Sequence, residues 1–321
     1  MGTDDAPAIE VAGAVRALED LPPDTEVVLV GDESRVIDEL GRHSGFDRDR
    51  ISVFHAPDRI LPEESPASAV RRKRESSIVI GLELQKAGDL DAFVSAGSTG
   101  AVMAASLFRL RPLPGVDRPA IGTVLPTAAG PALMLDAGAN VDCKPSQLVQ
   151  FAHLGKIYAQ DLMGVPDPRI GLLNIGEEPE KGDDVSVEAH RLLVSSGLNF
   201  IGNVEGRDII RGACDVLVCD GFVGNILLKF YESVAEFTVG LLTKEVSVSH
   251  AELNLDEVFR VLDYSEYGGA PLLGVNGVTI ICHGQSNTKA IRNALGVAAQ
   301  AVSKGMVGHI ARELSVDQQG G

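Results

Sequence analysis

The stretch 91–110, DAFVSAGSTGAVMAASLFRL, joins a short apolar run to a helical pattern through a turn of glycine, serine and threonine. The run AFVSA has the length and composition of a buried strand. From Thr99 onward, apolar side chains recur at helical spacing. Glycine and small polar residues between the two are typical of a strand that turns into a helix. The stretch therefore predicts one strand–turn–helix unit.

The same alternation of apolar runs and helical patterns recurs along the chain. Runs that precede a helical pattern are EVVLVG (26–31), PALMLDAG (131–138), DVLVCDG (215–221) and VTIICHG (278–284), and further strand candidates are RIGLLNIG (169–176) and NFIGNV (199–204). Short β-branched runs separated by helices favour an α/β fold with a doubly wound, largely parallel sheet. Because the chain has no internal repeat and no low-complexity linker, we expect a single domain over residues 1–321.

Composition restricts the classes of function. A formal net charge of −17 disfavours nucleic acid binding, which needs a basic face. The start MGTDDAPAIE lacks the basic and apolar parts of a secretory signal, and no apolar run has the length of a membrane span. The cysteines at 143, 214, 219 and 282 form no CxxC pair. We therefore expect reduced thiols in a cytoplasmic protein.

Several common site patterns are absent from the sequence. There is no GxxxxGK[ST] or GxGxxG for a nucleotide, no HExxH or zinc-type cysteine spacing, and no GxSxG nucleophile turn. Cys282 and His283 are adjacent at a strand end and should point in opposite directions, which favours a buried thiol. The sequence therefore indicates a transferase that works with neither metal nor cofactor and without a covalent intermediate.

Four predicted strand ends carry glycine with small polar residues and lead into a helix: SAGSTGA (95–101), DAGANVDCKP (136–145), CDGFVGN (219–225) and CHGQSN (282–287). Open α/β sheets bind ligands at the carboxyl ends of their strands. Backbone N–H groups at helix N-termini favour anions there, and glycine lets an anion approach the main chain. One such turn is weak evidence, but four together predict a phosphate-type cleft.

The acidic stretch NIGEEPEKGDD (174–184) follows a predicted strand and contains one base, Lys181. Its spacing does not match a calcium-binding loop. We expect its glutamates to orient Lys181 and the loop backbone rather than to bind a metal.

Long motifs resemble the bacterial phosphate acyltransferase family of phospholipid synthesis. They are FVSAGSTGAVMAASLFRLRPLPGVDRPAIGTVLPT (93–127), LDAGANVDCKPSQLVQFA (135–152), GLLNIGEEPEKG (171–182), NFIGNVEGRDI (199–209), VCDGFVGNILLK (218–229), YGGAPLLGVNG (267–277) and AVRRKRESS (69–77). The resemblance runs from about residue 2 to 303. It implies transfer of a long-chain fatty acyl group from acyl carrier protein to inorganic phosphate. A phosphotransacetylase-like enzyme that uses acyl coenzyme A is the alternative.

The resemblance also implies a fold and partners. The fold should be similar to isocitrate/isopropylmalate dehydrogenases and phosphotransacetylases, and the protein should be a homodimer. It should work in the cytoplasm in peripheral contact with the membrane. Its acyl phosphate product should pass to a membrane glycerol-3-phosphate acyltransferase.

The polar turns supply the candidate site residues. We expect Asp220 to act as general base, Asn225 to face the oxyanion and Lys181 to balance phosphate charge. Asp136 and Asp183 are alternatives for the base, and helix N-capping is a competing interpretation of each aspartate. Residues expected to bind phosphate or the acyl group are Ser98, Thr99, Gly100, Asn140, Lys144, Gly176, Glu177, Gly221, Ser286 and Asn287.

The amino terminus departs from the family pattern. Members usually begin with a short apolar strand that leads into a turn of the form MGGDxAP, whereas this sequence begins within that turn and has Thr3 where glycine is expected. Without that strand, the sheet should contain a gap whose backbone groups lack partners. The departure also leaves Asp4 and its loop uncertain as site residues.

Two surface features suggest contacts. Ile226, Phe230, Val234, Phe237 and Leu241 form an apolar stripe at helical spacing, and Leu255, Val258, Phe259 and Leu262 form a second one. In the resembled family, residues 226–265 should be a projecting helical segment that contacts the second subunit, the membrane or both. The consecutive bases Arg71, Arg72, Lys73 and Arg74 are either a solvated turn or the docking patch for the acidic carrier protein.

Overall fold

The computed structural model describes residues 2–246 and 264–317. The second predicted stripe, at Leu255, Val258, Phe259 and Leu262, lies outside the described residues. The chain divides into two compact units. Unit 1 comprises Met1–Pro119 and Tyr267–Gly321, and unit 2 comprises Ala120–Glu266.

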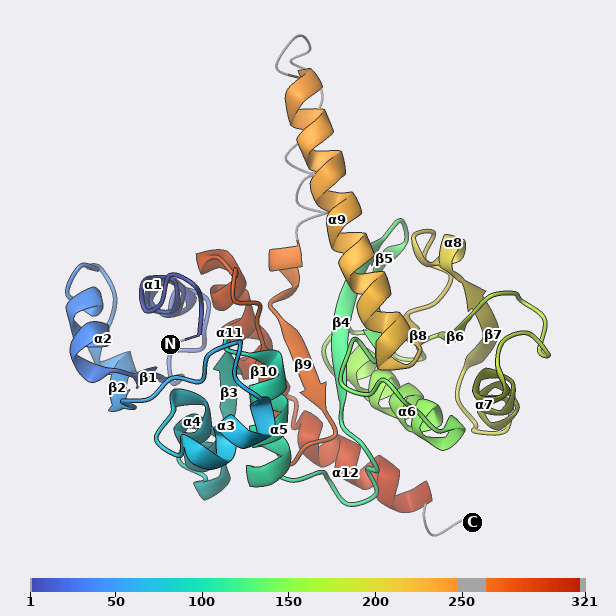
Figure 1. The fold of residues 1–321 in the computed structure, drawn as a ribbon, viewed down its shortest axis with the longest axis horizontal. Coiled ribbons are helices and arrows are strands. Elements are labelled where there is room, and N and C mark those ends of the chain that lie inside the picture. Colours follow the sequence, from blue (N-terminus) through green and yellow to red (C-terminus); the bar gives the residue numbers. More distant parts are fainter. Residues whose placement is uncertain (1, 247–263, 318–321) are drawn as a thin grey trace. The chain divides into compact units, whose positions relative to one another are not determined.

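Unit 1 has helices around two groups of strands (Figure 1). Its elements are α1 (Ala8–Ala17), β1 (Val27–Gly31), α2 (Glu33–Leu40), the 3-10 turn η1 (Arg48–Arg50), β2 (Ile51–His55), α3 (Pro66–Arg72), α4 (Ser77–Ala87), β3 (Ala92–Ser95), α5 (Thr99–Arg109), β9 (Ala270–Leu273), β10 (Val278–Ile281), α11 (Thr288–Ser303) and α12 (Met306–Asp317). A second 3-10 turn, η2 (Tyr264–Tyr267), leads from unit 2 into unit 1.

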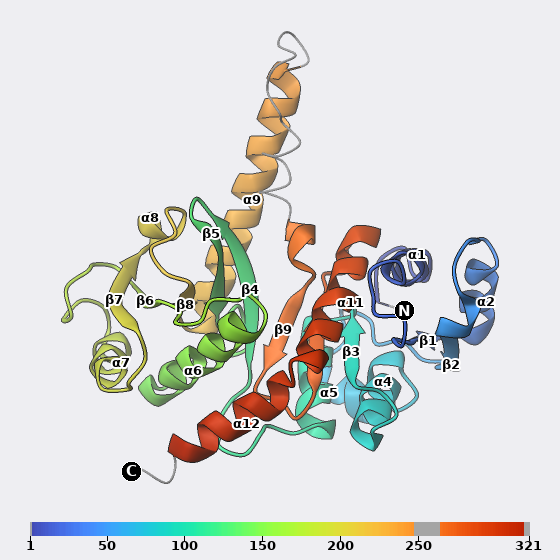
Figure 2. The ribbon, with the colours of Figure 1, turned by 180° about the vertical axis from the view of Figure 1, so that it is seen from behind.

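The strands of unit 1 pair in the order β3-β10-β9 and, separately, β1-β2. β3 is parallel to β10 and β1 is parallel to β2, whereas β9 is antiparallel to β10. Helices α11 and α12 lie in front of the group β3-β10-β9 in Figure 2, and α3 and α5 lie in front of that group in Figure 1. A Cβ on Gly81 would lie 2.2 Å from Phe93, so glycine lets α4 pack closely on β3.

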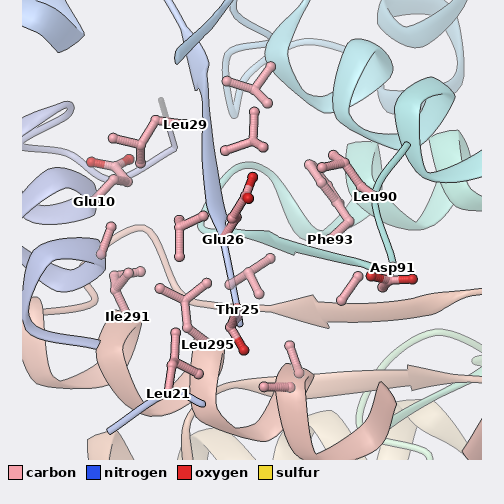
Figure 3. Close-up of a pocket in the computed structure, with 18 of the residues that line it drawn as sticks. Glu10, Leu21, Thr25, Glu26, Leu29, Leu90, Asp91, Phe93, Ile291 and Leu295 are labelled. Atoms are coloured by element: carbon pink, nitrogen blue, oxygen red, sulfur yellow. The ribbon is translucent and has the colours of Figure 1, made fainter. Parts of the chain in front are cut away.

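A groove separates β1 from β3 (Figure 3). Its cavity of about 640 Å³ is lined along both strands, and by α1 and α11 through residues such as Val11, Ile291 and Leu295. Among the described residues, β1 pairs only with β2 and β3 only with β10, so each strand has one unpaired edge.

Unit 2 contains β4 (Ala120–Thr127), β5 (Gly130–Leu135), α6 (Pro145–Asp161), β6 (Ile170–Asn174), α7 (Asp184–Val194), β7 (Phe200–Glu205), α8 (Gly206–Ile209), β8 (Val216–Val218) and α9 (Gly221–Val246). The strand order is β4-β5-β8-β6-β7. β4 and β5 form an antiparallel hairpin, and all the other pairs in this unit are parallel.

The core of unit 2 is formed by fully buried apolar side chains of β5, β8 and α6, including Leu133, Leu135, Leu217 and Phe151. A Cβ on Gly155 would lie 2.4 Å from Val216, so this glycine lets α6 pack on β8. α6 lies in front of the strands in Figure 2 and α9 in Figure 1, so the two helices cover opposite faces. Because β5, β8, β6 and β7 are parallel, the loops that follow them lie at one edge of the sheet.

The α/β class and the largely parallel pairing predicted from the sequence are confirmed. Each strand run named above forms a strand, and the helical pattern from Thr99 and the stripe from Ile226 to Leu241 each lie in a helix, α5 and α9. The antiparallel strands β4 and β9 were not predicted. β4 (AIGTVLPT) contains both glycine and proline, and β9 (APLL) contains proline and is flanked by glycines, so both segments resemble turns when only composition is considered.

The groove leads to a first prediction. Gly2 lies at the carboxyl end of β3, since a Cβ on it would be 2.4 Å from the carbonyl carbon of Ala96. Five apolar, β-branched residues added directly before Gly2 should therefore enter the groove and pair with both strand edges. Each kcal/mol that this pairing adds to the free energy of unfolding should raise Tm by about 2–4 °C, which calorimetry measures. A Gly-Ser extension of equal length is the control, and an equal Tm for the two extended proteins would contradict this prediction.

Candidate functional site

The carboxyl ends of β3 and β10 form the polar edge of unit 1. The N–H of Cys282 donates to the carbonyl of Ser95 at 2.8 Å, so the turns that follow the two strands are adjacent. The N–H of Asp4 donates to the carbonyl of Gly284 at 2.9 Å, which adds the amino-terminal turn to this edge. The guanidinium of Arg59 donates to the carbonyls of Gly2 and Thr3, both at 3.0 Å, and holds that turn in place.

The N-terminus of α5 has open donors. Ser98 is the N-cap residue, yet its side chain makes no capping hydrogen bond. The N–H of Val102 donates to the carbonyl oxygen of Ser98. The N–H groups of Thr99, Gly100 and Ala101 have no acceptor among the described residues. Such N–H groups, together with the helix dipole, favour an anion. The predicted residues Ser98, Thr99 and Gly100 are therefore together at one anion-favouring position.

The other two polar residues of this edge are already engaged. Asn287 caps α11, because its Oδ1 accepts from the N–H of Ala290 at 2.9 Å. Ser286 is buried, and its N–H donates to the carbonyl of His283 at 2.9 Å. Both residues shape the turn after β10, next to the turn after β3.

In unit 2, the turn after β5 is organised by the buried carboxylate of Asp136. Its Oδ1 accepts from the N–H groups of Ile121 at 2.9 Å, Gly138 at 3.3 Å and Ala139 at 3.1 Å. Its Oδ2 accepts from the N–H of Asn140 at 2.6 Å and from the Nδ2 of the same residue at 3.1 Å. Burial raises the pKa of Asp136, while these N–H donors act in the opposite direction. The amides of this turn therefore serve Asp136 and are not open to an anion.

The first turn of α9 is also satisfied. The N–H of Gly221 donates to the carbonyl of Asn140 at 2.7 Å. Asp220 Oδ1 accepts from the N–H groups of Phe222 at 2.8 Å and Val223 at 2.9 Å. This is the N-cap interpretation that the sequence left open for Asp220.

Asn225, on the same turn of α9, stands beside Gly138. A Cβ on Gly138 would lie 3.4 Å from the Cβ of Asn225, and the φ of Gly138, +136°, favours glycine. The Asn225 side chain is exposed and has no hydrogen-bond partner among the described residues. It is therefore an available amide donor at this edge of unit 2.

Two buried thiols and one lysine complete these turns. Cys143 Sγ lies 3.4 Å from the carbonyl oxygen of Asn140, and Cys219 Sγ lies 3.6 Å from that of Asp136. Burial raises the pKa of the Cys219 thiol well above its ordinary value, which disfavours the nucleophilic thiolate. Lys144 begins α6, and its N–H donates to Oε1 of Gln147 at 2.9 Å.

The acidic loop is held by side-chain amides that the sequence analysis did not identify. Nδ2 of Asn174 donates to the carbonyl of Lys181, and Nδ2 of Asn203 to that of Glu178, both at 2.8 Å. No ion pair joins Lys181 to a glutamate among the described residues. The predicted orientation of Lys181 by these carboxylates is therefore not seen.

Other parts of the loop have separate roles. Glu177 lies 3.7 Å from Arg207. Asp183 caps α7 through the N–H of Ser186 at 2.8 Å, and this backbone hydrogen bond lowers the pKa of Asp183. A Cβ on Gly176 would lie 2.9 Å from Cγ of Lys181, so the lysine stem lies across Gly176.

The four consecutive bases differ in their contacts. Arg72 and Lys73 pair with Glu64 at 2.8 and 2.6 Å. The N–H of Leu61 and the ammonium of Lys73 lower the pKa of Glu64 to about 2. Arg71 stacks on Phe108, with its Cζ 5.0 Å from the ring centroid. Arg74 makes no ion pair among the described residues, so Arg71 and Arg74 are the bases left for a partner.

Comparison with known proteins places the chain in a family. The family model described as "Fatty acid synthesis protein" matches residues 1–309. The chain belongs to this family. A relative from Desulforamulus reducens named "Phosphate acyltransferase" is 47% identical, covering 99% of this chain and 96% of its own length. One of the same name from Heliobacterium modesticaldum is 49% identical, covering 97% of this chain and 94% of its own length. The resemblance stated from the sequence motifs is thereby confirmed.

Solved structures agree on the fold of this family member. A phosphotransacetylase from Streptococcus pyogenes has a TM-score of 0.63 at 16% identity, covering 93% of this chain and 92% of its own. A 4-hydroxythreonine-4-phosphate dehydrogenase from Klebsiella pneumoniae has a TM-score of 0.52 at 14% identity, covering 95% of each chain. The predicted similarity to phosphotransacetylases and dehydrogenase-type folds is thus confirmed.

The described residues contain neither a helix suited to span a membrane nor a metal-binding cluster. None of their helices has the length and apolar character needed to cross a membrane. No group of three or more histidine, cysteine, aspartate and glutamate side chains among them is arranged to hold a metal ion.

The contact between α9 and the Asp136 turn leads to a second prediction. A Cβ on Gly224 would lie 1.9 Å from the carbonyl oxygen of Asp136, whereas nothing lies within 4 Å of one on Gly240. Gly224→Ala should therefore cost about 1–3 kcal/mol or more by overpacking, while Gly240→Ala on the same helix should be neutral or slightly stabilising. Denaturant unfolding measures both, and equal stabilities of the two variants would show that the contact is not tight.

Proposed function

We propose that this protein transfers a long-chain fatty acyl group from acyl carrier protein to inorganic phosphate and releases acyl phosphate. The observation that carries the proposal is the N-terminus of α5, where three consecutive N–H groups lack acceptors among the described residues. The family and the names of its relatives support acyl transfer to phosphate.

The chemistry requires an anion site and a donor for the developing oxyanion. A phosphate oxygen attacks the thioester carbonyl carbon, a C–O bond forms, and the C–S bond breaks. The carrier's thiolate leaves and takes up a proton. In this proposal, Ser98 and the open amides of α5 bind phosphate. As a separate assignment within unit 2, the Asn225 amide is the proposed donor to the carbonyl oxygen as it gains charge. Catalysis then rests on positioning and electrostatics, with no nucleophile from the protein.

Acyl coenzyme A is the alternative donor. The structural similarity to a phosphotransacetylase makes the comparison necessary, but at 16% identity it supports only the fold. The residue runs of this chain are much closer to those of the relatives named phosphate acyltransferase, which are 47–49% identical.

A direct assay tests the donor. Palmitoyl-acyl carrier protein and palmitoyl-coenzyme A are offered separately to the chain with phosphate, and acyl phosphate is trapped with hydroxylamine. Phosphate-dependent turnover with the carrier protein is the expected result. Turnover with coenzyme A alone would move the assignment to the alternative, and no turnover with either donor would refute it.

We also propose that the carrier protein docks at Arg71 and Arg74. The acidic carrier needs a local basic surface on a chain whose net charge is −17. Both guanidinium groups are exposed and unpaired with carboxylates among the described residues, while Arg72 and Lys73 share the carboxylate of Glu64.

Paired substitutions test the docking surface. Arg71→Ala with Arg74→Ala should raise the carrier KM about fivefold, since each exposed ion pair contributes about 0.5 kcal/mol. The salt dependence of this KM should also become shallower. Lys86→Ala with Lys304→Ala removes two exposed lysines of the same unit as a control. If both double variants change the carrier KM equally, the effect comes from overall charge, and docking at Arg71 and Arg74 is contradicted.

The stripe on α9 is the proposed contact with the membrane and a second subunit. Ile226, Phe230 and Phe237 are 53%, 66% and 66% exposed, and α9 extends beyond the strands of unit 2 (Figure 1). Peripheral binding there would bring acyl phosphate to a membrane glycerol-3-phosphate acyltransferase.

A charge placed in the stripe tests this contact. Phe237→Glu should reduce co-sedimentation with anionic phospholipid vesicles, because a carboxylate at an apolar contact must be desolvated. Val194→Glu on α7 is a matched control, since Val194 is 67% exposed. Sedimentation velocity without vesicles shows whether the stripe also joins two subunits. Equal vesicle binding by both variants would exclude the membrane contact.

A further inference from the structure

Asp136 is saturated with hydrogen-bond donors. Its two carboxylate oxygens offer about four lone-pair sites, and five N–H donors from Ile121, Gly138, Ala139 and Asn140 approach them. All five partners donate, so a proton on either oxygen would have no acceptor. The side chain is 0% exposed. This geometry suits an ionised carboxylate that takes part in no proton transfer.

The same carboxylate sets the shape of the turn beneath Asn225. Accepting from the N–H groups of Gly138 and Ala139 folds the chain back over Asp136 and places Gly138 at φ +136°. Asn225 lies in van der Waals contact with this turn, since a Cβ on Gly138 would be 3.4 Å from the Cβ of Asn225 and 3.5 Å from its Cγ. The carbonyl of Asp136 also lies directly against Gly224, the residue before Asn225.

A second connection runs through Asn140. Its N–H and Nδ2 both donate to Asp136, and its carbonyl accepts from the N–H of Gly221 at the start of α9. Asp136 therefore fixes both the surface beside Asn225 and the beginning of the helix that carries Asn225.

We propose that Asp136 is a positioning residue that fixes the amide of Asn225 for the reacting carbonyl, acting through the turn 136–140 and the first turn of α9. The inference rests on the proposed function for its catalytic consequence. It assigns Asp136 a role other than that of a general base, because both oxygens are already fully used.

The position of the Asn225 amide is measured independently of activity. The side-chain NH₂ resonances of Asn225 are assigned in ¹⁵N-labelled protein by their loss in Asn225→Ala. In Asp136→Asn, the new side-chain NH₂ group faces the N–H donors that the carboxylate accepted from. The turn should therefore rearrange, and the two NH₂ resonances of Asn225 should shift. Asp215→Asn is the control, since Asp215 accepts from Arg169 at the opposite end of β8. An unshifted Asn225 pair in Asp136→Asn would overturn the proposal even if the protein had no transferase activity.

A double-mutant cycle measures the catalytic consequence. Asp136→Asn should lower kcat about 10²-fold, as expected for a misplaced catalytic group, and Asp215→Asn should leave it unchanged. In the Asn225→Ala background, Asp136→Asn should cause little further loss, because Asp136 acts through Asn225. If the fold-losses in kcat of the two single variants multiply in the double variant, Asp136 acts independently of Asn225, and the proposal is overturned.

A second variant covers the case in which Asp136→Asn does not fold. Gly138→Ala keeps the carboxylate but places a Cβ against Asn225. It should lower kcat similarly and also lose its effect in the Asn225→Ala background. Undiminished kcat in folded Gly138→Ala would contradict the proposed link. If the wild-type protein is inactive with both acyl donors, only the proposed function is refuted. The resonance shift of Asn225 still tests whether Asp136 positions it.

Discussion

The convergence of five N–H donors on the Asp136 carboxylate is the interaction on which the edge of unit 2 depends. A buried carboxylate without a cation partner is costly, and it persists only where hydrogen bonds replace its water. Here they come from β4, from the turn after β5 and from a side-chain amide. The donors that stabilise the charge are the same groups that shape the turn, and the turn in turn positions the start of α9.

This arrangement separates satisfied backbone donors from open ones. In unit 2, Asp136 closes the turn after β5, Asp220 caps α9 and Asp183 caps α7. In unit 1, α11 is capped by Asn287, while α5 keeps three open N–H groups. Glycine-rich turns that look equivalent in sequence therefore differ in chemistry. An anion is favoured at α5, and Asn225 in unit 2 has an available side-chain amide.

Strand runs and helical patterns predicted most of the fold because buried β-branched runs are strong local signals. Asp136, Asp183 and Asp220 show where sequence reasoning stopped. All three follow strands and were candidates for a base. Asp183 and Asp220 accept from N–H groups two or three residues later, which is the N-cap interpretation that the sequence left open, whereas Asp136 also accepts from a backbone group distant in sequence. The 0% exposure of Asp136 and its bond from Ile121, fifteen residues earlier, have no local signature. Likewise, Asn174 and Asn203 were missed because isolated asparagines resemble ordinary loop residues.

The central claim is that phosphate binds to the open amides at the N-terminus of α5. Thr99 is the first helical residue, where proline fits a helix and removes one N–H, and Ser98 has the extended ψ of 118° that a following proline needs. The most direct measurement is therefore the phosphate KM of Thr99→Pro against Thr99→Ala, which lacks the hydroxyl but keeps the amide. Because a hydrogen bond to a charged group contributes about 1.5–3 kcal/mol, the account predicts a phosphate KM at least about tenfold higher in Thr99→Pro. Equal phosphate KM values in the two folded variants would contradict it.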